Sequence, residues 1–303
     1  MKKFFLKPYR WAVIFSLLLI GSFTFVLLDT FVIPQSFTAV AAKSQTETAQ
    51  TSSLTQSDAE ISDTSYEDKN IKINIKTVRK YDTTFYVADV QLANASCLQT
   101  ALAGDTYGRN IKETTSKMAK EKNAILAING DYYGFRNSGY VLRNGTVYRD
   151  TAGNGGDNEN LVIDRNGDFS IIKESEASMK SLDTDNIWQI FSFGPALIEN
   201  GQITVDSGSE VAQSKNSNPR TAIGQISKLH YMIIVSDGRT SESEGLSLLE
   251  LAQEFKERGC TTAYNLDGGG SSTMYFNGKV VNNPTDGRNQ GEREVSDIVY
   301  IGY

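Results

Sequence analysis

The sequence contains few of the residues on which many catalytic and metal sites depend. Its 303 residues include one histidine, His230, which removes most catalytic schemes that rest on imidazole. With one histidine and two cysteines, the sequence shows no metal-ligand spacing of the kind that binds zinc. Basic residues number 30 against 36 acidic ones, which gives a net charge of -6. This charge argues against a nucleic acid partner, because binding to a phosphate backbone requires a basic face.

The histidine and the two cysteines are expected to be structural. His230 begins the apolar run HYMIIV, which is typical of a buried strand. Cys97 and Cys260 lie outside the cell if the N-terminus is interpreted as described below, and a disulfide could persist there. Two cysteines so far apart in sequence are also typical of buried thiols, which we favour over the bridge.

One long hydrophobic run lies near the N-terminus. The run from Trp11 to Leu28 follows several basic residues, and as a helix it would be about 27 Å long, just enough to cross a bilayer core. The preceding basic residues place the N-terminus in the cytoplasm and the remainder outside. The alternative is a cleaved signal peptide with the small-residue site Ala39-Val40-Ala41. Because that site lies well beyond the run, we favour a signal-anchor over residues 1–33 in the cell membrane.

The segment after the anchor is predicted to be a disordered linker over residues 34–66. Residues 43–66 are rich in Ser, Thr, Gln and acidic residues, with almost nothing to bury, and this composition is typical of disorder. The linker would hold the following domain clear of the membrane, and in a Gram-positive cell it would reach into the wall.

Residues 67–303 are predicted to form a single α+β domain, rich in strands arranged in mixed sheets, with few helices. Strands are expected at 71–76, 84–92, 124–130, 222–226, 230–235, 261–266 and 294–303, and helices at 110–123 and 246–258. Four Asn-Gly dipeptides with apolar flanks predict hairpins at Asn144-Gly145, Asn166-Gly167, Asn200-Gly201 and Asn277-Gly278.

The most unusual stretch is NLDGGGSSTMYFNG, residues 265–278. Asp267 stands at the carboxyl end of a predicted buried strand, and Gly268, Gly269 and Gly270 follow it at once. Three consecutive glycines suit neither a helix nor a strand. They indicate a backbone that other residues cannot adopt, or one that something approaches closely. The alternative is a glycine-rich turn with a capping Asp.

Polar side chains gather where four predicted strands begin or end. The segments are 129–135, 218–221, 236–239 and 265–272. If these ends converge, they bring three carboxylates, two guanidinium groups, amides and hydroxyls around one pocket. Such a set suits an anionic, hydroxyl-rich ligand.

The motifs NGDYYGF, NPRTAIG, VSDGR and NLDGGGSSTM, followed by a terminal ER-V, occur in this order, and together they resemble the phosphodiester glycosidase family. The resemblance covers roughly Thr77 to the C-terminus. Bacterial members of this family are often labelled exopolysaccharide biosynthesis proteins. The resemblance implies hydrolysis of the bond between an anomeric carbon and a phosphate that is esterified to a second group.

The resemblance also implies roles for individual residues. Asp267 would act at the anomeric carbon or activate water, with Asp237 as the second acid, and Arg220 would place positive charge on the phosphate. The expected substrate-binding residues are Asn129, Asp131, Arg239, Gly268, Gly269, Gly270, Ser271, Ser272 and Arg293. Asp131 departs from the pattern, because many relatives carry a small residue there.

Each residue role has a structural alternative. Asp237 could belong to a turn, Arg220 to a solvated strand start and Arg293 to a surface salt bridge, while the two serines could be caps. No cofactor is required, but oxygen ligands such as Asp131, Asp237 or Asp267 would suit calcium or magnesium.

Two other functions are kept as alternatives to the glycosidase. One is a metal-assisted phosphodiesterase that attacks phosphorus. The other is a non-catalytic module that binds glycans within a polysaccharide assembly complex. In each case the expected partner is a cell-surface glycan or glycopolymer phosphodiester.

Overall fold

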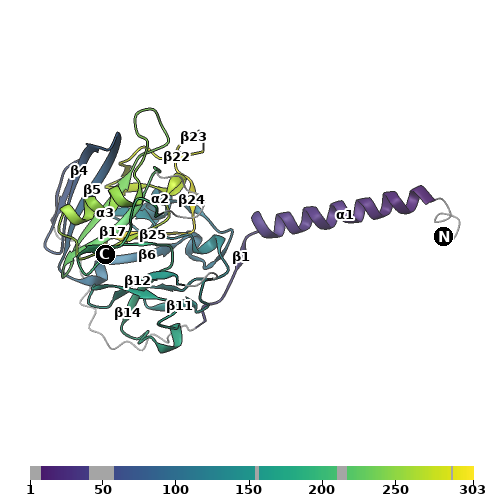
Figure 1. Ribbon diagram of the computed structural model, residues 1–303, viewed down its shortest axis with the longest axis horizontal. Helices are drawn as coiled ribbons and strands as arrows, with labels where there is room; N and C mark the ends of the chain where they lie inside the picture. Colours follow the sequence, from purple (N-terminus) through teal and green to yellow (C-terminus); the bar gives the residue numbers. More distant parts are fainter. Residues whose placement is uncertain (1–7, 41–57, 154–156, 210–216, 288) are drawn as a thin grey trace.

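The computed structural model describes residues 8–40, 58–153, 157–209, 217–287 and 289–303. Helix α1 (Pro8–Phe31) extends away from the folded domain, and the short strand β1 (Gln35–Ser36) lies at the junction (Figure 1). The stretch Tyr9–Phe31 has a mean hydropathy of 2.4 and is long and apolar enough to cross a membrane. A signal sequence would have the same properties, so the helix alone does not decide between an anchor and a signal peptide.

The largest sheet has nine strands, in the order β16-β15-β19-β17-β18-β5-β4-β3-β2. Its strands are β2 (Glu60–Ile61), β3 (Ser65–Glu67), β4 (Ile71–Lys80), β5 (Thr83–Leu92), β15 (Ala196–Glu199), β16 (Gln202–Ile203), β17 (Thr221–Ser227), β18 (His230–Ser236) and β19 (Thr262–Asn265). Strand β19, which leads to Asp267, lies between β15 and β17. Because β15 and β17 both run antiparallel to β19, the first residues of β15 and β17 lie beside the last residues of β19.

Two sheets of five strands complete the core. One has the order β21-β20-β9-β25-β6, with strands β6 (Leu98–Leu102), β9 (Leu126–Asn129), β20 (Met274–Phe276), β21 (Lys279–Val280) and β25 (Asp297–Ile301). The other has the order β11-β10-β14-β12-β13, with strands β10 (Val141–Arg143), β11 (Thr146–Arg149), β12 (Glu159–Asp164), β13 (Phe169–Lys173) and β14 (Ile187–Phe191). Two-stranded pairs join β1 to β7 (Gly108–Arg109), β8 (Glu113–Thr114) to β24 (Glu294–Val295), and β22 (Thr285–Asp286) to β23 (Asn289–Gln290).

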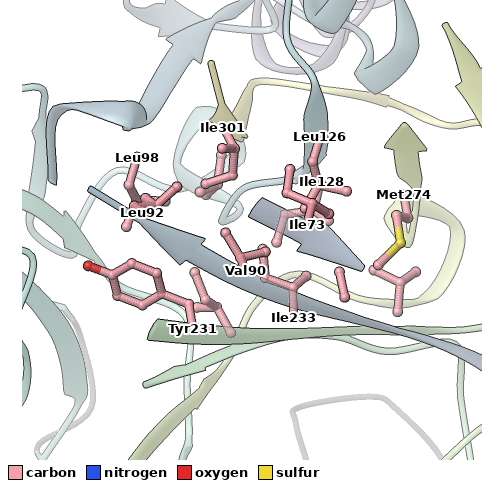
Figure 2. Packing of buried hydrophobic residues seen from close by; sticks show 14 of the residues in the cluster. Ile73, Val90, Leu92, Leu98, Leu126, Ile128, Tyr231, Ile233, Met274 and Ile301 are labelled. Carbon is pink, nitrogen blue, oxygen red and sulfur yellow. The ribbon is translucent and has the colours of Figure 1, made fainter. Parts of the chain in front are cut away.

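The main hydrophobic core lies between the nine-stranded sheet and the sheet that contains β9. Figure 2 shows Val90 and Ile233 of the first sheet facing Ile128 of the second. Alternate residues on the nine-stranded sheet, such as Met232 and Ile234, belong to a second cluster with α3 (Leu248–Glu257). The alternation of side chains therefore buries both faces of the sheet over β15, β17, β18 and β19, whereas β4 buries one face and exposes the other.

Two short helices complete the regular structure of the domain. Helix α2 (Thr115–Glu121) is capped by Thr114, whose hydroxyl accepts a bond from the Lys117 N–H. Helix α3 begins with a reciprocal capping box between Ser247 and Glu250. Short 3-10 turns are η2 (Ala95–Cys97), η3 (Ala103–Asp105), η4 (Tyr133–Phe135), η5 (Met179–Ser181) and η6 (Gly269–Ser271).

The strand-rich α+β prediction is confirmed, with one correction to the sheets. Every strand pairing within the described ranges is antiparallel, so the expected mixture of parallel and antiparallel strands was wrong for this part of the chain. The four Asn-Gly hairpins are confirmed. Asn144, Asn200 and Asn277 have φ angles of 49°, 50° and 43°, as a tight hairpin turn requires. The helix expected from residue 110 begins only at Thr115, because the two preceding residues pair with β24 instead.

The predicted linker, residues 34–66, is ordered at both ends. At its start, β1 pairs with β7. At its end, β2 and β3 add to the edge of the nine-stranded sheet, and Tyr66 is buried in the main core. Such short polar strands are held by backbone hydrogen bonds, which composition does not reveal. Residues 41–57 of the linker lie outside the described residues.

The cysteines are two buried free thiols, so the disulfide alternative was wrong. Burial raises the pKa of Cys97 to about 11 and that of Cys260 to about 12. Both side chains therefore stay protonated at neutral pH and contribute to packing.

Candidate active site

The four polar segments converge at the end of β19. The backbone N–H of Asp267 donates to the carbonyl of Gly130 (3.3 Å), and the Asn129 side chain donates to the carbonyl of Asp267 (2.6 Å). The N–H of Gly269 donates to the carbonyl of Pro219 (2.8 Å). Arg220 in turn exchanges two hydrogen bonds of 2.9 Å with Ser236. The convergence expected from the sequence is therefore present.

The three glycines make room for neighbouring groups. A Cβ at Gly268 would lie 2.8 Å from the carbonyl oxygen of Pro219. At Gly269, where φ is +62°, it would lie 2.8 Å from Nη2 of Arg239, and at Gly270 it would lie 2.7 Å from Nη2 of Arg293. The absence of side chains on the backbone after Asp267 therefore allows two guanidinium groups to pack against it.

Asp267 is partly exposed at the centre of this cluster. Burial raises the pKa of Asp267 to about 6, although the adjacent Ser271 hydroxyl and the charges of Arg293 and Arg136 oppose the rise. The ordinary pKa of an aspartate is about 3.9. This carboxyl group therefore changes its protonation close to neutral pH, as a general base or acid requires.

Several buried polar atoms beside Asp267 lack a protein partner. Within the described residues, the hydroxyls of Ser272 and Thr273 and the amide oxygen of Asn265 have no hydrogen bond. A buried polar atom left unpaired costs about 1–3 kcal/mol, and such atoms are rare in folded proteins. We therefore expect water or a polar ligand beside them.

Three arginines surround the glycine turn at different depths. Arg220 is buried, and its Nε donates to the carbonyl of Leu246 (2.9 Å). Arg239 is exposed, and Nε and Nη2 both donate to Oδ1 of Asn218 (3.3 and 3.1 Å). Arg293 donates through Nε and Nη2 to Oδ1 of Asp286 (2.9 and 2.6 Å). Arg239 and Arg293 thus remain accessible to an anion from solvent.

Asp237 lies deeper and is held by protein groups. Its Oδ1 accepts the N–H of Asn283 (2.7 Å). Burial raises the pKa of Asp237, and that N–H, the Asn282 side chain and the Tyr86 hydroxyl oppose the rise. Asn282 also donates to the carbonyl of Ser272 (2.9 Å). Asp237 therefore supports the loop that carries the serines.

Asn129 and Asp131 are buried and bonded within the protein, and the substrate-binding role expected for them stays a prediction. Oδ1 of Asn129 accepts from the Thr221 hydroxyl (2.8 Å) and from the Thr273 N–H (3.2 Å). Asp131 pairs with Nη2 of Arg143 (2.8 Å) and accepts two backbone N–H groups. With these bonds made, neither side chain is presented to solvent.

Arg143 joins Asp131 to a second buried carboxylate, Asp297. Its Nε donates to Oδ2 of Asp297 (2.9 Å), and all three side chains are almost fully buried. Burial raises the pKa of Asp297, the Arg143 charge opposes the rise, and the Asp131 charge adds to it. Gly130 packs directly against the Asp297 carboxylate, where a Cβ would collide with it. This network therefore fixes the segment that receives the Asp267 backbone.

A sequence comparison assigns most of this chain to one family. A family model described as phosphodiester glycosidase matches residues 122–302. The chain belongs to the phosphodiester glycosidase family. The resemblance drawn from the motifs is thereby confirmed.

Two curated relatives illustrate what this chain is similar to. The SPbeta prophage-derived uncharacterized protein YomE of Bacillus subtilis is 32% identical over 203 residues, which cover 65% of this chain and 31% of YomE. Human N-acetylglucosamine-1-phosphodiester alpha-N-acetylglucosaminidase is 28% identical over 207 residues, covering 63% of this chain and 40% of the human protein. The chain thus spans less than half the length of these relatives.

Solved structures show that the fold is shared. The zebrafish N-acetylglucosamine-1-phosphodiester alpha-N-acetylglucosaminidase catalytic domain, auto-inhibited by its pro-peptide, matches with a TM-score of 0.61 at 20% identity, covering 77% of this chain and 83% of that one. A hypothetical protein from Synechocystis matches with a TM-score of 0.52 at 15% identity, covering 77% and 62%.

Sequence reasoning missed two charged residues near the turn that carries Asp267. Arg136 lowers the pKa of Asp267, and Asp286 holds Arg293. Arg136 directly follows the motif NGDYYGF, a signal that could have been used, whereas nothing local marks Asp286. Among the described residues, no group of three or more His, Cys, Asp or Glu is arranged to hold a metal ion.

Proposed function

We propose that this protein is a hydrolase that cleaves sugar-1-phosphodiesters, of the N-acetylglucosamine-1-phosphate type, by breaking the bond between the anomeric carbon and oxygen. The observation that carries the proposal is the placement of Asp267 on a glycine turn against which Arg239 and Arg293 pack. Family membership and the name of the human relative support the substrate class.

The reaction suits a site with more arginines than acids at its surface. The leaving group is a phosphate monoester, which departs far more readily than a sugar alkoxide, so it needs positive charge more than a proton. The planar guanidinium groups of Arg239 and Arg293 match the geometry of phosphate oxygens. Arg220, which is buried, adds a further positive charge. Ser271, Ser272 and the Gly270 N–H would orient the substrate, while the Gly269 N–H stays bonded to the carbonyl of Pro219.

Asp267 acts in this proposal as the base that activates water at the anomeric carbon. A pKa of about 6 leaves the group ionised at neutral pH while it still holds a proton well. As the sugar develops positive charge in the transition state, the nearby carboxylate also stabilises it. Asp237 is the second acid of the proposal, and its raised pKa suits a proton reservoir.

The test is release of sugar from methyl N-acetylglucosamine-α-1-phosphate by the full chain in detergent, with and without EDTA. We expect release that survives EDTA and disappears in Asp267→Asn and Arg220→Ala. Asp105→Asn is the matched control, because Asp105 is exposed and Asn tolerates its φ of 49°. Loss with EDTA would favour the metal-assisted phosphodiesterase, and binding without release would favour a glycan-binding module.

We further propose that the enzyme stays anchored in the cell membrane with its domain outside, where a role in exopolysaccharide or cell-wall metabolism would follow. The support is that the segment after α1 is bonded to the domain. Phe37 and Val40 donate backbone N–H bonds to Tyr107 and Val147 (2.9 and 3.0 Å). The Asn110 side chain donates to two carbonyls at the end of α1 and just beyond it, those of Thr30 and Ile33 (3.2 and 3.1 Å).

Cleavage after Ala41 would remove all of these contacts. Gly108 adds to the argument, because the carbonyl of Gln35 lies so close that a Cβ at Gly108 would collide with it. Mass spectrometry of the protein recovered from membranes tests the proposal. An intact chain that includes α1 is expected, and a mature chain that begins at Ala42 would contradict it.

A further inference from the structure

An aromatic group of unassigned role lies beside Asp267. Tyr132 and Phe135 stack with ring centroids 4.6 Å apart and an interplanar angle of 19°. Cζ of Arg136 lies 5.7 Å from the ring centroid of Tyr132 and 5.0 Å from that of Phe193. These four residues, Tyr132, Phe135, Arg136 and Phe193, are called the aromatic platform below.

Within the nine-stranded sheet, Phe193 of the platform lies on one side of β19, and Arg220 and Arg239, which adjoin β17 and β18, lie on the other side. Phe193 precedes β15, and the carbonyl of the next residue, Gly194, accepts a bond from the Asn265 side chain (2.8 Å). Arg220 precedes β17, on the opposite side of β19. Asp267 therefore lies between an aromatic flank and a cationic flank.

The other part of the platform follows the segment bonded to Asp267. Gly130 accepts the Asp267 N–H, and Tyr132 comes two residues later. The charge of Arg136 also lowers the pKa of Asp267, so its guanidinium lies within electrostatic range of the carboxylate. Both parts of the platform are thus adjacent to the proposed reacting group.

Phe135 is one of the few large hydrophobic side chains that this domain exposes to solvent. Among the described residues after residue 57, the exposed large hydrophobic side chains are Ile61, Phe135 and Tyr303. Phe135 is 37% exposed, and it is the one that lies beside the proposed site. Exposed aromatic surface at a polar site commonly marks ligand contact.

The platform is fixed in place before any ligand binds. Nη1 of Arg136 donates to the carbonyl of Ser192 (3.0 Å). The carbonyl of Arg136 accepts Nη1 of Arg149 (2.6 Å), which also donates to the carbonyl of Tyr133 (3.1 Å). A rigid surface of this kind binds a ligand without the entropic cost of ordering it.

We propose that the aromatic platform binds the sugar ring of the substrate, while Arg239 and Arg293 bind its phosphate. The faces of the aromatic rings are apolar, as is the C–H face of a pyranose, and the Arg136 guanidinium can donate to a ring substituent. Bound in this way, the substrate spans the two flanks and places its anomeric carbon at Asp267. This inference rests on the proposed function and names the part of the site that selects a sugar.

The test separates sugar binding from phosphate binding in the full chain. Two probes are titrated by calorimetry, the methyl α-glycoside of N-acetylglucosamine and methyl phosphate. Phe135→Ala is expected to weaken glycoside binding about tenfold, as expected for losing the burial of one aromatic face, and to leave methyl phosphate binding unchanged. Arg239→Ala is expected to weaken methyl phosphate binding and to leave glycoside binding unchanged. Phe135→Tyr keeps the flat ring and should restore glycoside binding.

The matched control is Tyr303→Ala, because Tyr303 is 36% exposed but is bonded to Asp68 instead of lying at the site. It should leave both probes unaffected, and circular dichroism checks that each variant is folded. Equal weakening of both probes in Phe135→Ala, or no glycoside binding by the wild type, would overturn the platform. If wild type binds the glycoside through Phe135 but hydrolyses nothing, the platform stands and the proposed hydrolase fails.

Discussion

Replacing Arg143 by methionine tests whether the buried Asp131–Arg143–Asp297 network supports the site. The substitution keeps a long apolar stem but removes both ion pairs, of 2.8 and 2.9 Å, and leaves two carboxylates almost fully buried. Breaking a buried pair by removing one partner costs about 3–5 kcal/mol. For a domain of this size, each kcal/mol shifts the melting temperature by roughly 2–4 °C, so we expect a fall on the order of 10 °C.

The pH dependence of that loss gives the prediction a definite sign. In the wild type the pKa of Asp297 is raised in the folded state, so folding favours the protonated form. The contribution of Asp297 to stability is therefore greatest at low pH and declines as the pH rises from about 4, the pKa in the unfolded chain, toward the folded pKa. Without Arg143 the folded pKa rises further. The destabilisation of Arg143→Met should hence be larger at pH 8 than at pH 5.

Thermal unfolding of the full chain in detergent, followed by near-ultraviolet circular dichroism at both pH values, measures this effect. Adding Asp297→Asn to Arg143→Met removes one charge and should recover part of the loss. The control is Lys279→Met, which breaks the exposed pair with Asp63 and should cost about 0–1 kcal/mol. A fall no larger than that of the control, or one independent of pH, would refute the reasoning.

Three further predictions follow from single residues. Gly269→Ala should lower kcat/KM at least about tenfold, because the new methyl group displaces Arg239. The control is Gly201→Ala, where φ is a similar 71° and no atom lies within 4 Å of the new methyl group, so only a stability cost of about 1 kcal/mol is expected. Equal kcat/KM in the two variants would contradict this prediction. The kcat/KM of the wild type should fall as the pH drops through about 6, because Asp267 becomes protonated, and a pH profile that is flat between 5 and 8 would exclude Asp267 as the base. Ser247→Ala should cost about 1 kcal/mol by removing the cap of α3 without changing kcat/KM, which denaturant unfolding and the sugar-release assay measure together.

Local backbone chemistry made part of the fold predictable. The Asn-Gly turns carry their own conformational signal, because Asn and Gly tolerate the left-handed region that tight hairpins need. The same logic pointed to Asp267, since three glycines directly after a buried strand suit neither a helix nor a continuing strand. In the structure, two of these glycines accommodate the guanidinium groups of Arg239 and Arg293.

Contacts between distant segments were not predictable from one sequence. Arg143 directly precedes the Asn144-Gly145 turn, yet it pairs with Asp131 and Asp297, the latter 154 residues away. Nothing in the local pattern shows that a charged residue is buried when its partner is so distant. The bonds of Asp131 to Arg143 and to two backbone N–H groups were unpredictable for the same reason.

The position of the bond that breaks tests the central claim most directly. The full chain is incubated with methyl N-acetylglucosamine-α-1-phosphate in water labelled with ¹⁸O, and both products are analysed by mass spectrometry. The proposed mechanism predicts the label in the released sugar, because water attacks the anomeric carbon. Label in the phosphate product would mean attack at phosphorus, and would contradict the role assigned to Asp267.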